Sequence, residues 1–297
     1  MNFDRWRCRQ HRLDIGSGEL ESLDLPVSGQ QSVQRGWTAA ANVALRIWLP
    51  AGSVTVECWD RDSIDVRGTV AGKSLFFGGI AADGSSGKFG VEAQRRDDPR
   101  LPSAELRVMV PRRARIAIKM TDGVAEARGG AGSLEVLLVT GRVTVRDASG
   151  TVAVETLDAE VVLERITGAV QVRNGSGTAA LSDLQGSLAL TTVGGAVQVT
   201  GGRLGDGRIE SFGGAITVRG SLRPDARLDV SSHDGSITLA LVRARLPRLD
   251  LVSRGGGVRN ALGPGAVRHG EIVARSFKGR INVVPLGGIE GGKVTSP

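Results

Sequence analysis

The sequence predicts an all-β protein: a single-stranded β-helix, or β-solenoid, built from strand units of about nine residues, two per coil. Glycine accounts for 43 of the 297 residues, and between residues 123 and 203 it returns at nearly every ninth position. Within the units apolar and polar side chains alternate, which is the pattern of a strand with one buried face. Aromatic residues are only 3% of the chain, which suits a thin core of small aliphatic side chains between two sheets.

The nine-residue phase is clearest between residues 123 and 203. Glycine fills eight of nine successive slots, and alanine fills the other; the slots are Gly123, Gly132, Gly141, Gly150, Ala159, Gly168, Gly177, Gly186 and Gly195. A glycine lets the backbone bend where a Cβ atom would clash. Position eight of a unit is often apolar, and we expect these side chains to tuck each turn into the core: Val139, Leu157, Ile166, Leu184 and Val193.

Two units per coil would place residues 18 apart in one stack. Val143, Val161, Ala179 and Val197 would then line one face, and Leu134, Val152, Val170 and Leu188 the other. An antiparallel β meander or sandwich also tolerates a nine-residue period and is the alternative. The scarcity of in-phase Asn-Gly pairs, the common turn of β-hairpins, favours the solenoid.

Composition divides the chain into four parts. Residues 1–37 are predicted to be a polar N-terminal arm, and residues 38–120 a β-strand entry and cap region that holds two of the four tryptophans. Residues 121–285 form the repeat region, regular over 123–203 and looser, with insertions, over 204–285. Residues 286–297 are predicted to be a flexible glycine-rich tail.

The net charge of +7 lies in one late segment, because basic and acidic residues balance over residues 1–202. The insertions and outward strand positions of residues 203–280 supply a predicted basic flank, which consists of Arg203, Arg219, Arg223, Arg227, Arg243, Arg245 and Arg248. Guanidinium groups suit carboxylates and phosphates, so anionic envelope polymers, lipids or a protein partner are expected. Nucleic acid is disfavoured because the segment has few rings on which bases could stack.

Signs of chemistry are weak. The three histidines are dispersed, no carboxylate recurs in phase to bind calcium, and GTVAGKS (68–74) lacks the spacing of a phosphate-binding loop. We therefore expect no cofactor, no metal and no catalysis. Acid pairs such as Asp158/Glu160 and Glu155/Glu164 leave a polysaccharide-active β-helix enzyme as an alternative. Cys8 and Cys58 do not have the spacing of a zinc site, and whether they pair is left open.

Three segments carry a family resemblance: ALRIWLPAGSVTVECWDRDSIDVRGTV (44–70), VPRRARIAIKMTDG (110–123) and the tandem G-x-V-x-V units. In this order they resemble the bacterial putative-adhesin family of β-strand-repeat proteins of unknown function, from about Leu45 to about Pro285. The resemblance implies an exported or cell-envelope protein. The N-terminus shows no signal peptide, so a cytoplasmic location is the alternative, and no apolar run is long enough to span a membrane.

These observations favour a non-catalytic β-repeat scaffold of the adhesion type, which binds an anionic partner through its basic flank. Besides the enzyme, the alternative is a structural solenoid that self-associates through its ends, where strand edges are unpaired.

Overall fold

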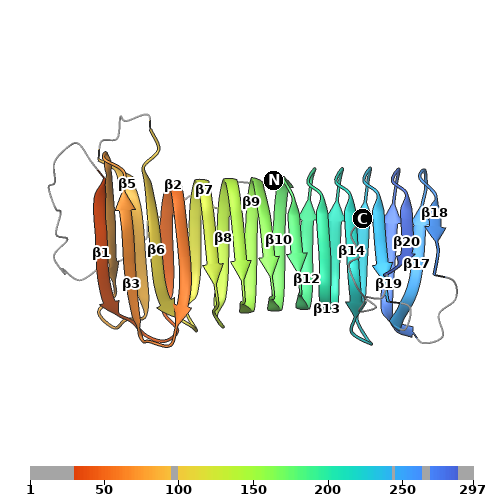
Figure 1. Ribbon diagram of the computed structural model, residues 1–297, viewed down its shortest axis with the longest axis horizontal. Helices are drawn as coiled ribbons and strands as arrows, with labels where there is room; N and C mark the ends of the chain where they lie inside the picture. The colour runs from red at the N-terminus through yellow and green to blue at the C-terminus, as the bar shows by residue number, and fades with distance from the viewer. Residues whose placement is uncertain (1–29, 95–99, 243–244, 263–267, 287–297) are drawn as a thin grey trace, which may run out of the picture.

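The computed structural model describes residues 30–94, 100–242, 245–262 and 268–286. These residues form an elongated rod of β-strands that lie side by side across its axis, with no α-helix among them (Figure 1). The all-β prediction is confirmed. The last residues of the predicted polar arm are part of the first strand, and residues 287–297 of the predicted tail lie outside the described part.

The described residues form twenty strands. They are β1 (Gln31–Thr38), β2 (Ala44–Trp59), β3 (Ser63–Val70), β4 (Ser74–Ile80), β5 (Ser86–Ala93), β6 (Ser103–Pro111), β7 (Arg115–Arg128), β8 (Ser133–Arg146), β9 (Ser149–Glu164), β10 (Thr167–Ser176), β11 (Ala179–Ser182), β12 (Gln185–Thr192), β13 (Val197–Ser211), β14 (Ile216–Leu222), β15 (Arg227–Ser232), β16 (Ile237–Leu241), β17 (Leu246–Ser253), β18 (Val258–Asn260), β19 (Arg268–Ser276) and β20 (Ile281–Pro285).

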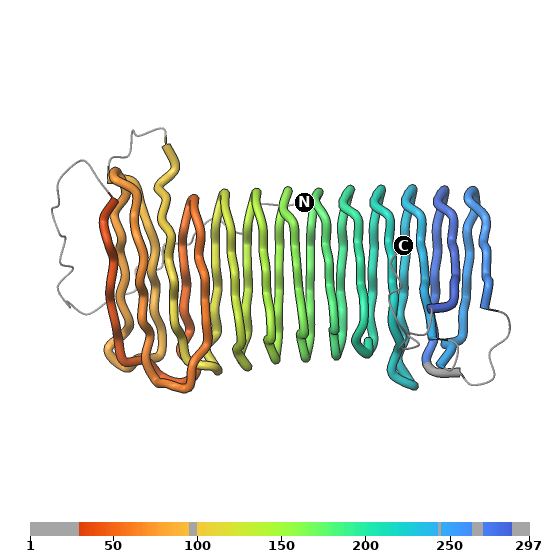
Figure 2. The backbone as a smooth tube through the Cα atoms, viewed as in Figure 1, coloured from red at the N-terminus to blue at the C-terminus, as the bar shows by residue number. Residues whose placement is uncertain are grey.

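Along the middle of the rod each strand pairs in parallel with the chain 18 residues later. Val143 pairs with Val161, and Ala179 pairs with Val197. We name the sheet that contains Leu188 face 1 and the sheet that contains Val197 face 2; the chain crosses between them at two corners in every turn (Figure 2). All pairs of described strands from β7 onward are parallel, so the antiparallel alternative is not formed there.

The core is a single layer of inward side chains between the two faces. On face 1 one inward row follows the strand pairing for the length of the rod: Leu45, Ile116, Leu134, Val152, Val170, Leu188, Gly207, Leu228, Ile272 and Leu249. On face 2 the corresponding row includes Val143, Val161 and Val197, which are all fully buried. Like side chains therefore stack on like, as β-branched residues do on a pleated surface.

Corner 1, which follows face 1 and includes residues 193–195 of one turn, depends on glycine. A Cβ atom on Gly195 would run into the carbonyl oxygen of Gly177 in the preceding turn, and one on Gly141 would run into that of Gly123. Gly141 also has a φ of 126°, a conformation that other residues rarely adopt. The phased glycines thus allow successive backbones to touch.

Inside corner 1 the turns are closed by buried polar side chains. Asn174 is 1% exposed, and its amide donates to the carbonyl oxygens of Ala159 and Gly177 at 3.2 and 3.0 Å. Thr156 in the preceding turn donates to the amide oxygen of Asn174 at 2.8 Å. In the next turn the hydroxyl of Thr192 accepts from the Gly195 N–H at 3.3 Å. These bonds satisfy groups that would be costly to bury alone.

The prediction that position-eight side chains are buried is confirmed for two of the five residues and wrong for the other three. Ile166 and Leu184, at corner 2, are buried, whereas Val139, Leu157 and Val193, at corner 1, are 36%, 47% and 50% exposed. Corner 1 is already filled from within by the polar side chains just described. At corner 2 the preceding residues, Arg165 and Asp183, have φ values of 54° and 53°. We infer that this left-handed turn directs the next side chain inward.

Both ends of the rod depart from a simple sequential stack. At the N-terminal end, β2 pairs with β7 on one side and with β5 and β6 on the other, while β1–β3, β3–β6 and β4–β5 are antiparallel. Trp37 and Phe76 lie against the buried ring of Phe89 there, with ring centroids 4.8 and 6.5 Å away. At the other end β19 lies between β15 and β17, and β20 lies between β16 and β18. The turn formed by residues 268–285 therefore lies between the turn of residues 227–241 and the turn of residues 246–260, although it follows both of them in the sequence.

The adjacent glycines of corner 1 provide a matched test of the backbone contact. We expect Gly195→Ala to lower the free energy of unfolding by about 2–4 kcal/mol, because the new methyl group meets the Gly177 carbonyl. Gly194→Ala should change it by less than about 1 kcal/mol, because nothing lies within 4 Å of a Cβ there. Urea denaturation of both variants measures the difference. Equal losses would contradict the role given to Gly195.

Candidate functional site

Four arginines of the predicted basic flank lie around corner 2 in the later half of the rod. Arg203 and Arg223 are on neighbouring turns, because the Arg223 N–H donates to the carbonyl of Leu204. Arg219 pairs with Thr200 at the corner-2 end of face 2, and Arg245 precedes β17. All four are exposed, and none has an ion-pair partner among the described residues. We call these four residues the basic corner.

Arg227 and Arg248 lie elsewhere, on the outward surface of face 1. The carboxylate of Glu271 lies 2.9 Å from the guanidinium of Arg227 and 3.7 Å from that of Arg248. Arg227 also contacts Asp229 at 3.1 Å, and this carboxylate raises the pKa of Arg227 above its usual value. These two cations are therefore partly neutralised, unlike the basic corner. Arg243 lies outside the described residues.

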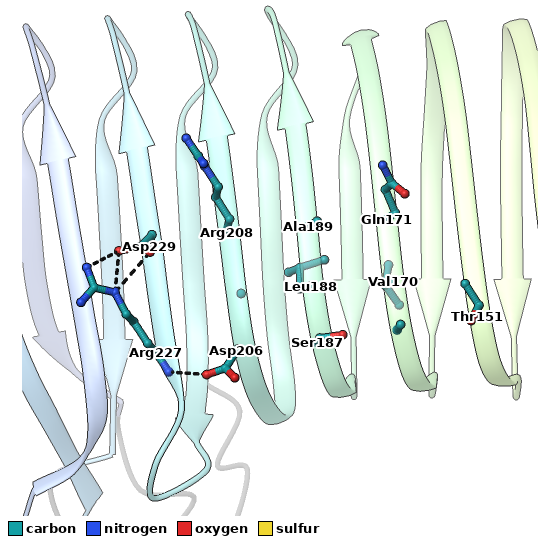
Figure 3. Close-up of a pocket in the computed structure, with 12 residues that line it drawn as sticks. Thr151, Val170, Gln171, Ser187, Leu188, Ala189, Asp206, Arg208, Arg227 and Asp229 are labelled. Atoms are coloured by element: carbon teal, nitrogen blue, oxygen red, sulfur yellow. Dashed lines mark hydrogen bonds and ion pairs between the residues drawn. The ribbon is translucent and has the colours of Figure 1, made fainter.

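A shallow hollow of about 620 Å³ opens on face 1 beside Arg227 (Figure 3). Its floor consists of short side chains from β9, β10, β12 and β13, and charged side chains stand at one end. The lining residues are Thr151, Ala169, Val170, Gln171, Ser187, Leu188, Ala189, Asp206, Gly207, Arg208, Arg227 and Asp229. The hollow is an open surface, suited to part of an extended molecule rather than to an enclosed small ligand.

A β-bulge at residues 205–207 shapes the charged end of the hollow. The pairing of β12 with β13 shifts by one residue between Gly186 and Leu188. The extra residue is stabilised by Asp206, whose carboxylate accepts the backbone N–H of Arg227 at 2.9 Å. Bulges commonly redirect side chains next to functional sites. The hollow was not predicted from the sequence, although the small residues at position two of alternate units (Thr151, Ala169 and Ser187) are a visible signal of it.

The acids of the hollow are engaged with Arg227. Asp206 accepts its backbone N–H, and Asp229 binds its side chain. Of the acid pairs considered for glycoside hydrolysis, Glu155 lies on face 1, while Glu160 and Glu164 lie on face 2 in contact with Arg142 and Arg146. Asp158 accepts a hydrogen bond from Ser176 at 2.9 Å. The arrangement therefore separates Glu155 from Glu164 on opposite surfaces.

In the described part of the chain, His233 is held by its neighbours, and no cluster of metal-binding side chains is present. His233 stacks between Phe212 and Phe277, with centroids 4.7 and 4.9 Å away, and contacts Asp234 at 2.8 Å. Lys278 lies 3.1 Å from the same carboxylate, and these contacts lower the pKa of Asp234. No group of three His, Cys, Asp or Glu side chains in the described ranges is arranged to hold a metal ion. The described residues contain no helix long and apolar enough to cross a membrane.

Comparison with known proteins gives limited information. No protein-family model matches the chain, and no curated protein matches it significantly. A putative cell adhesion protein from Clostridium sporogenes is 9% identical, with a TM-score of 0.25, and the match covers 86% of this chain and 99% of that one. A putative adhesin from Bacteroides fragilis is 11% identical, with a TM-score of 0.38, and the match covers 86% and 97%. At these identities and TM-scores neither structure assigns a function to the chain.

The thiol of Cys58 gives a test of the local structure at the N-terminal end of the rod. Cys58 is a free thiol; Cys8 lies outside the described residues. Burial raises the pKa of Cys58 from 9.0 to about 11, partly opposed by the charge of Arg112. The folded protein thus holds this proton more tightly than the unfolded chain. The resulting stability is complete below about pH 9 and is lost as the pH rises through about 11.

We expect iodoacetamide to alkylate Cys58 in a Cys8→Ser variant about a hundredfold more slowly at pH 8 when folded than when unfolded in urea. The folded rate should rise steeply between pH 9 and 11. Mass spectrometry of quenched samples measures both rates. Similar rates at pH 8 would show that the thiol is not buried as described.

Proposed function

We propose that this chain is a non-catalytic β-solenoid, an adhesion-type scaffold that presents a basic corner to an anionic envelope polymer. The observation that carries the proposal is the gathering of Arg203, Arg219, Arg223 and Arg245 on one corner without acidic partners in the described part of the chain. Such a group creates a local positive field that draws in anionic partners. Guanidinium forks then bind carboxylate or phosphate groups.

The repeat supports a solenoid scaffold. Parallel pairing at 18-residue steps runs through successive turns, for instance from Leu134 to Val152 and on to Val170. Each turn buries its apolar side chains only against its neighbours, so length can be added without a new core. A rod of this kind displays outward side chains at regular intervals, which suits repeated contact with an extended polymer.

The electrostatics of the carboxyl groups support a role without catalysis. Asp60, Asp83, Asp147 and Asp234 all have lowered pKa values, because arginine, lysine, serine or histidine groups hydrogen-bond to them. A general acid in glycoside hydrolysis needs a raised pKa instead. Of these four acids, Asp60, Asp147 and Asp234 are ion-pair partners on the surface of the rod.

The basic corner is tested by removing three of its charges. We expect Arg203→Ser, Arg219→Ser and Arg223→Ser together to weaken binding to immobilised polygalacturonate about tenfold at low salt and to flatten its salt dependence. The matched control removes three arginines that already have acidic partners, by Arg142→Ser, Arg146→Ser and Arg165→Ser. That control should bind within about twofold of the unaltered protein, because its arginines are largely neutralised.

Biolayer interferometry over a range of salt concentrations gives both affinities. Equal binding by both triple variants would reject the basic corner. Binding to anionic lipid vesicles but not to polygalacturonate would replace the polymer with a membrane surface as the partner.

Self-association through the C-terminal end of the rod is the second candidate. Among the described strands β17 pairs with β19 alone and β18 with β20 alone, which leaves one edge of each strand without a partner. Leu249 and Leu251 are only half-buried there, and Val258 is 45% exposed. Unpaired edges next to apolar side chains favour pairing with another chain.

For this candidate, sedimentation velocity should show a mass that increases with protein concentration. Val258→Asp should return the protein to a monomer, because a carboxylate would be buried in the contact. Val139→Asp, at an exposed valine in the middle of the rod, is the control and should leave association unchanged. A monomer at every concentration would reject self-association.

A further inference from the structure

A second basic surface lies on face 1 at the opposite end of the rod from the basic corner. The outward side chains of four neighbouring strands meet there: Phe77 from β4, Lys88 from β5, Arg46 and Trp48 from β2, and Arg115 and Lys119 from β7. We call these six residues the aromatic platform. They come from segments up to 73 positions apart in sequence, and the strand pairing alone brings them together.

The register fixes the layout of the platform. Phe77 pairs with Gly90, which pairs with Trp48, which pairs with Lys119, so these residues form one row across the strands. In the adjacent row Arg46 pairs with Lys88. A Cβ atom on Gly90 would collide with the ring of Phe77 at 2.6 Å. Glycine at position 90 therefore lets the Phe77 ring lie down on the sheet.

Both rings hold a lysine in place. The ammonium group of Lys88 lies 5.2 Å from the centre of the Phe77 ring, and that of Lys119 lies 4.7 Å from the centre of the Trp48 ring. Cation–π attraction of this kind restricts a long, flexible side chain. Because the lysines are already positioned, a bound anion costs less conformational entropy than it would with mobile lysines.

The platform is also poor in counter-charges. None of its four cations has an ion-pair partner among the described residues. The nearest acids by strand register are Glu135, which pairs with Ala117, and Glu92, which pairs with Leu75. On the late part of face 1, by contrast, Arg227 and Arg248 share Glu271. The stronger unneutralised positive charge of face 1 thus lies at its N-terminal end.

From these observations we infer that the aromatic platform is a binding site for an acidic polysaccharide. The pre-positioned lysines and the two arginines would bind carboxylate groups spaced along the polymer. The polymer is expected to continue across a row of short outward side chains, which starts beside Arg115 and leads into the hollow; the row is Ser133, Thr151, Ala169 and Ser187. Neighbouring strands are about 4.8 Å apart, close to the length of one sugar unit.

Other polyanions fit the platform less well. Single-stranded nucleic acid binds chiefly by stacking bases on open rings, whereas here lysines lie over Phe77 and Trp48. A lipid surface favours protruding apolar side chains that enter the acyl region, but Phe77 is only half-exposed and Trp48 is 41% exposed. A flat sheet with fixed cations suits an extended, hydrated polymer.

The test uses the full chain and polygalacturonate, a linear polymer of uronic acid. Lys88→Ser with Lys119→Ser should weaken binding about tenfold at low salt and make it less sensitive to salt. The control removes two cations outside the platform, by Arg35→Ser with Arg113→Ser, and should bind within about twofold of the unaltered protein. Both pairs change the net charge equally, so a general charge effect would act on both alike.

Trp48 is a positioning residue, and its variants separate that role from charge. Trp48→Ala should weaken binding about threefold without changing the net charge, because Lys119 becomes mobile, and Trp48→Phe should recover most of the loss because it retains a ring for the lysine. Unchanged binding by the Lys88/Lys119 variant would overturn the inference. So would binding to oligo-dT or anionic vesicles in place of polygalacturonate.

The proposals for the aromatic platform and for the basic corner can be rejected separately. If the Lys88/Lys119 variant binds normally while the Arg203/Arg219/Arg223 variant does not, the platform is rejected and the proposed function stands. The reverse result rejects the basic corner and leaves the platform as the polymer site.

Discussion

The rod depends on the contact between successive backbones at its corners. Parallel strands about 4.8 Å apart leave little room for a Cβ atom where the chain changes direction, and at Gly168 and Gly186 it would strike the carbonyl oxygen of the glycine one turn earlier. Glycine at these positions lets successive turns touch, at steps of 18 residues in the middle of the rod and at longer steps farther along, where Gly214 lies against Gly195 and Gly235 against Gly214. With the turns in contact, inward side chains stack on inward side chains, and the core, the polar closure of corner 1 and the outward rows all follow. Ala159, the exception, is 3% exposed and is accommodated between Gly141 and Gly177.

Periodicity made the middle of the rod predictable, because each turn there repeats a local pattern. The stack of Val143, Val161, Ala179 and Val197 follows directly from counting residues. Counting residues does not predict the strand pairing at the ends of the rod. Nothing in the local pattern of residues 268–285 indicates that β19 and β20 enter between turns already formed, because that arrangement depends on which strand edges remain open. It also fails at position eight, where a left-handed residue such as Arg165 reverses the direction of the following side chain.

The distribution of charge along the sequence also predicts only part of its distribution in space. A linear count places the excess of arginine and lysine in residues 203–280, and four of the predicted arginines do gather at corner 2. The count does not show that Arg227 and Arg248 share the carboxylate of Glu271. It also cannot show that four cations from the neutral segment 1–202 lie together on one surface. Balance along a sequence is compatible with separation in space whenever strands from distant segments become neighbours.

The aromatic platform depends both on the strand pairing at the end of the rod and on the distribution of charge on its surface, and neither was predicted from the sequence. Trp48 and Phe77 lie in the aromatic-rich early segment, which was predicted from the sequence to cap the rod. Trp37 and Phe89 do pack inside that end, but alternation along β2 and β4 turns Trp48 and Phe77 to the outside. A ring that does not help to cover the core is available for another contact, and here each such ring holds a lysine. Because the inward rows alone satisfy the packing requirements of the rod, its outward rows are free to carry recognition. The side of the strand on which an aromatic or charged residue falls therefore decides whether it serves stability or binding.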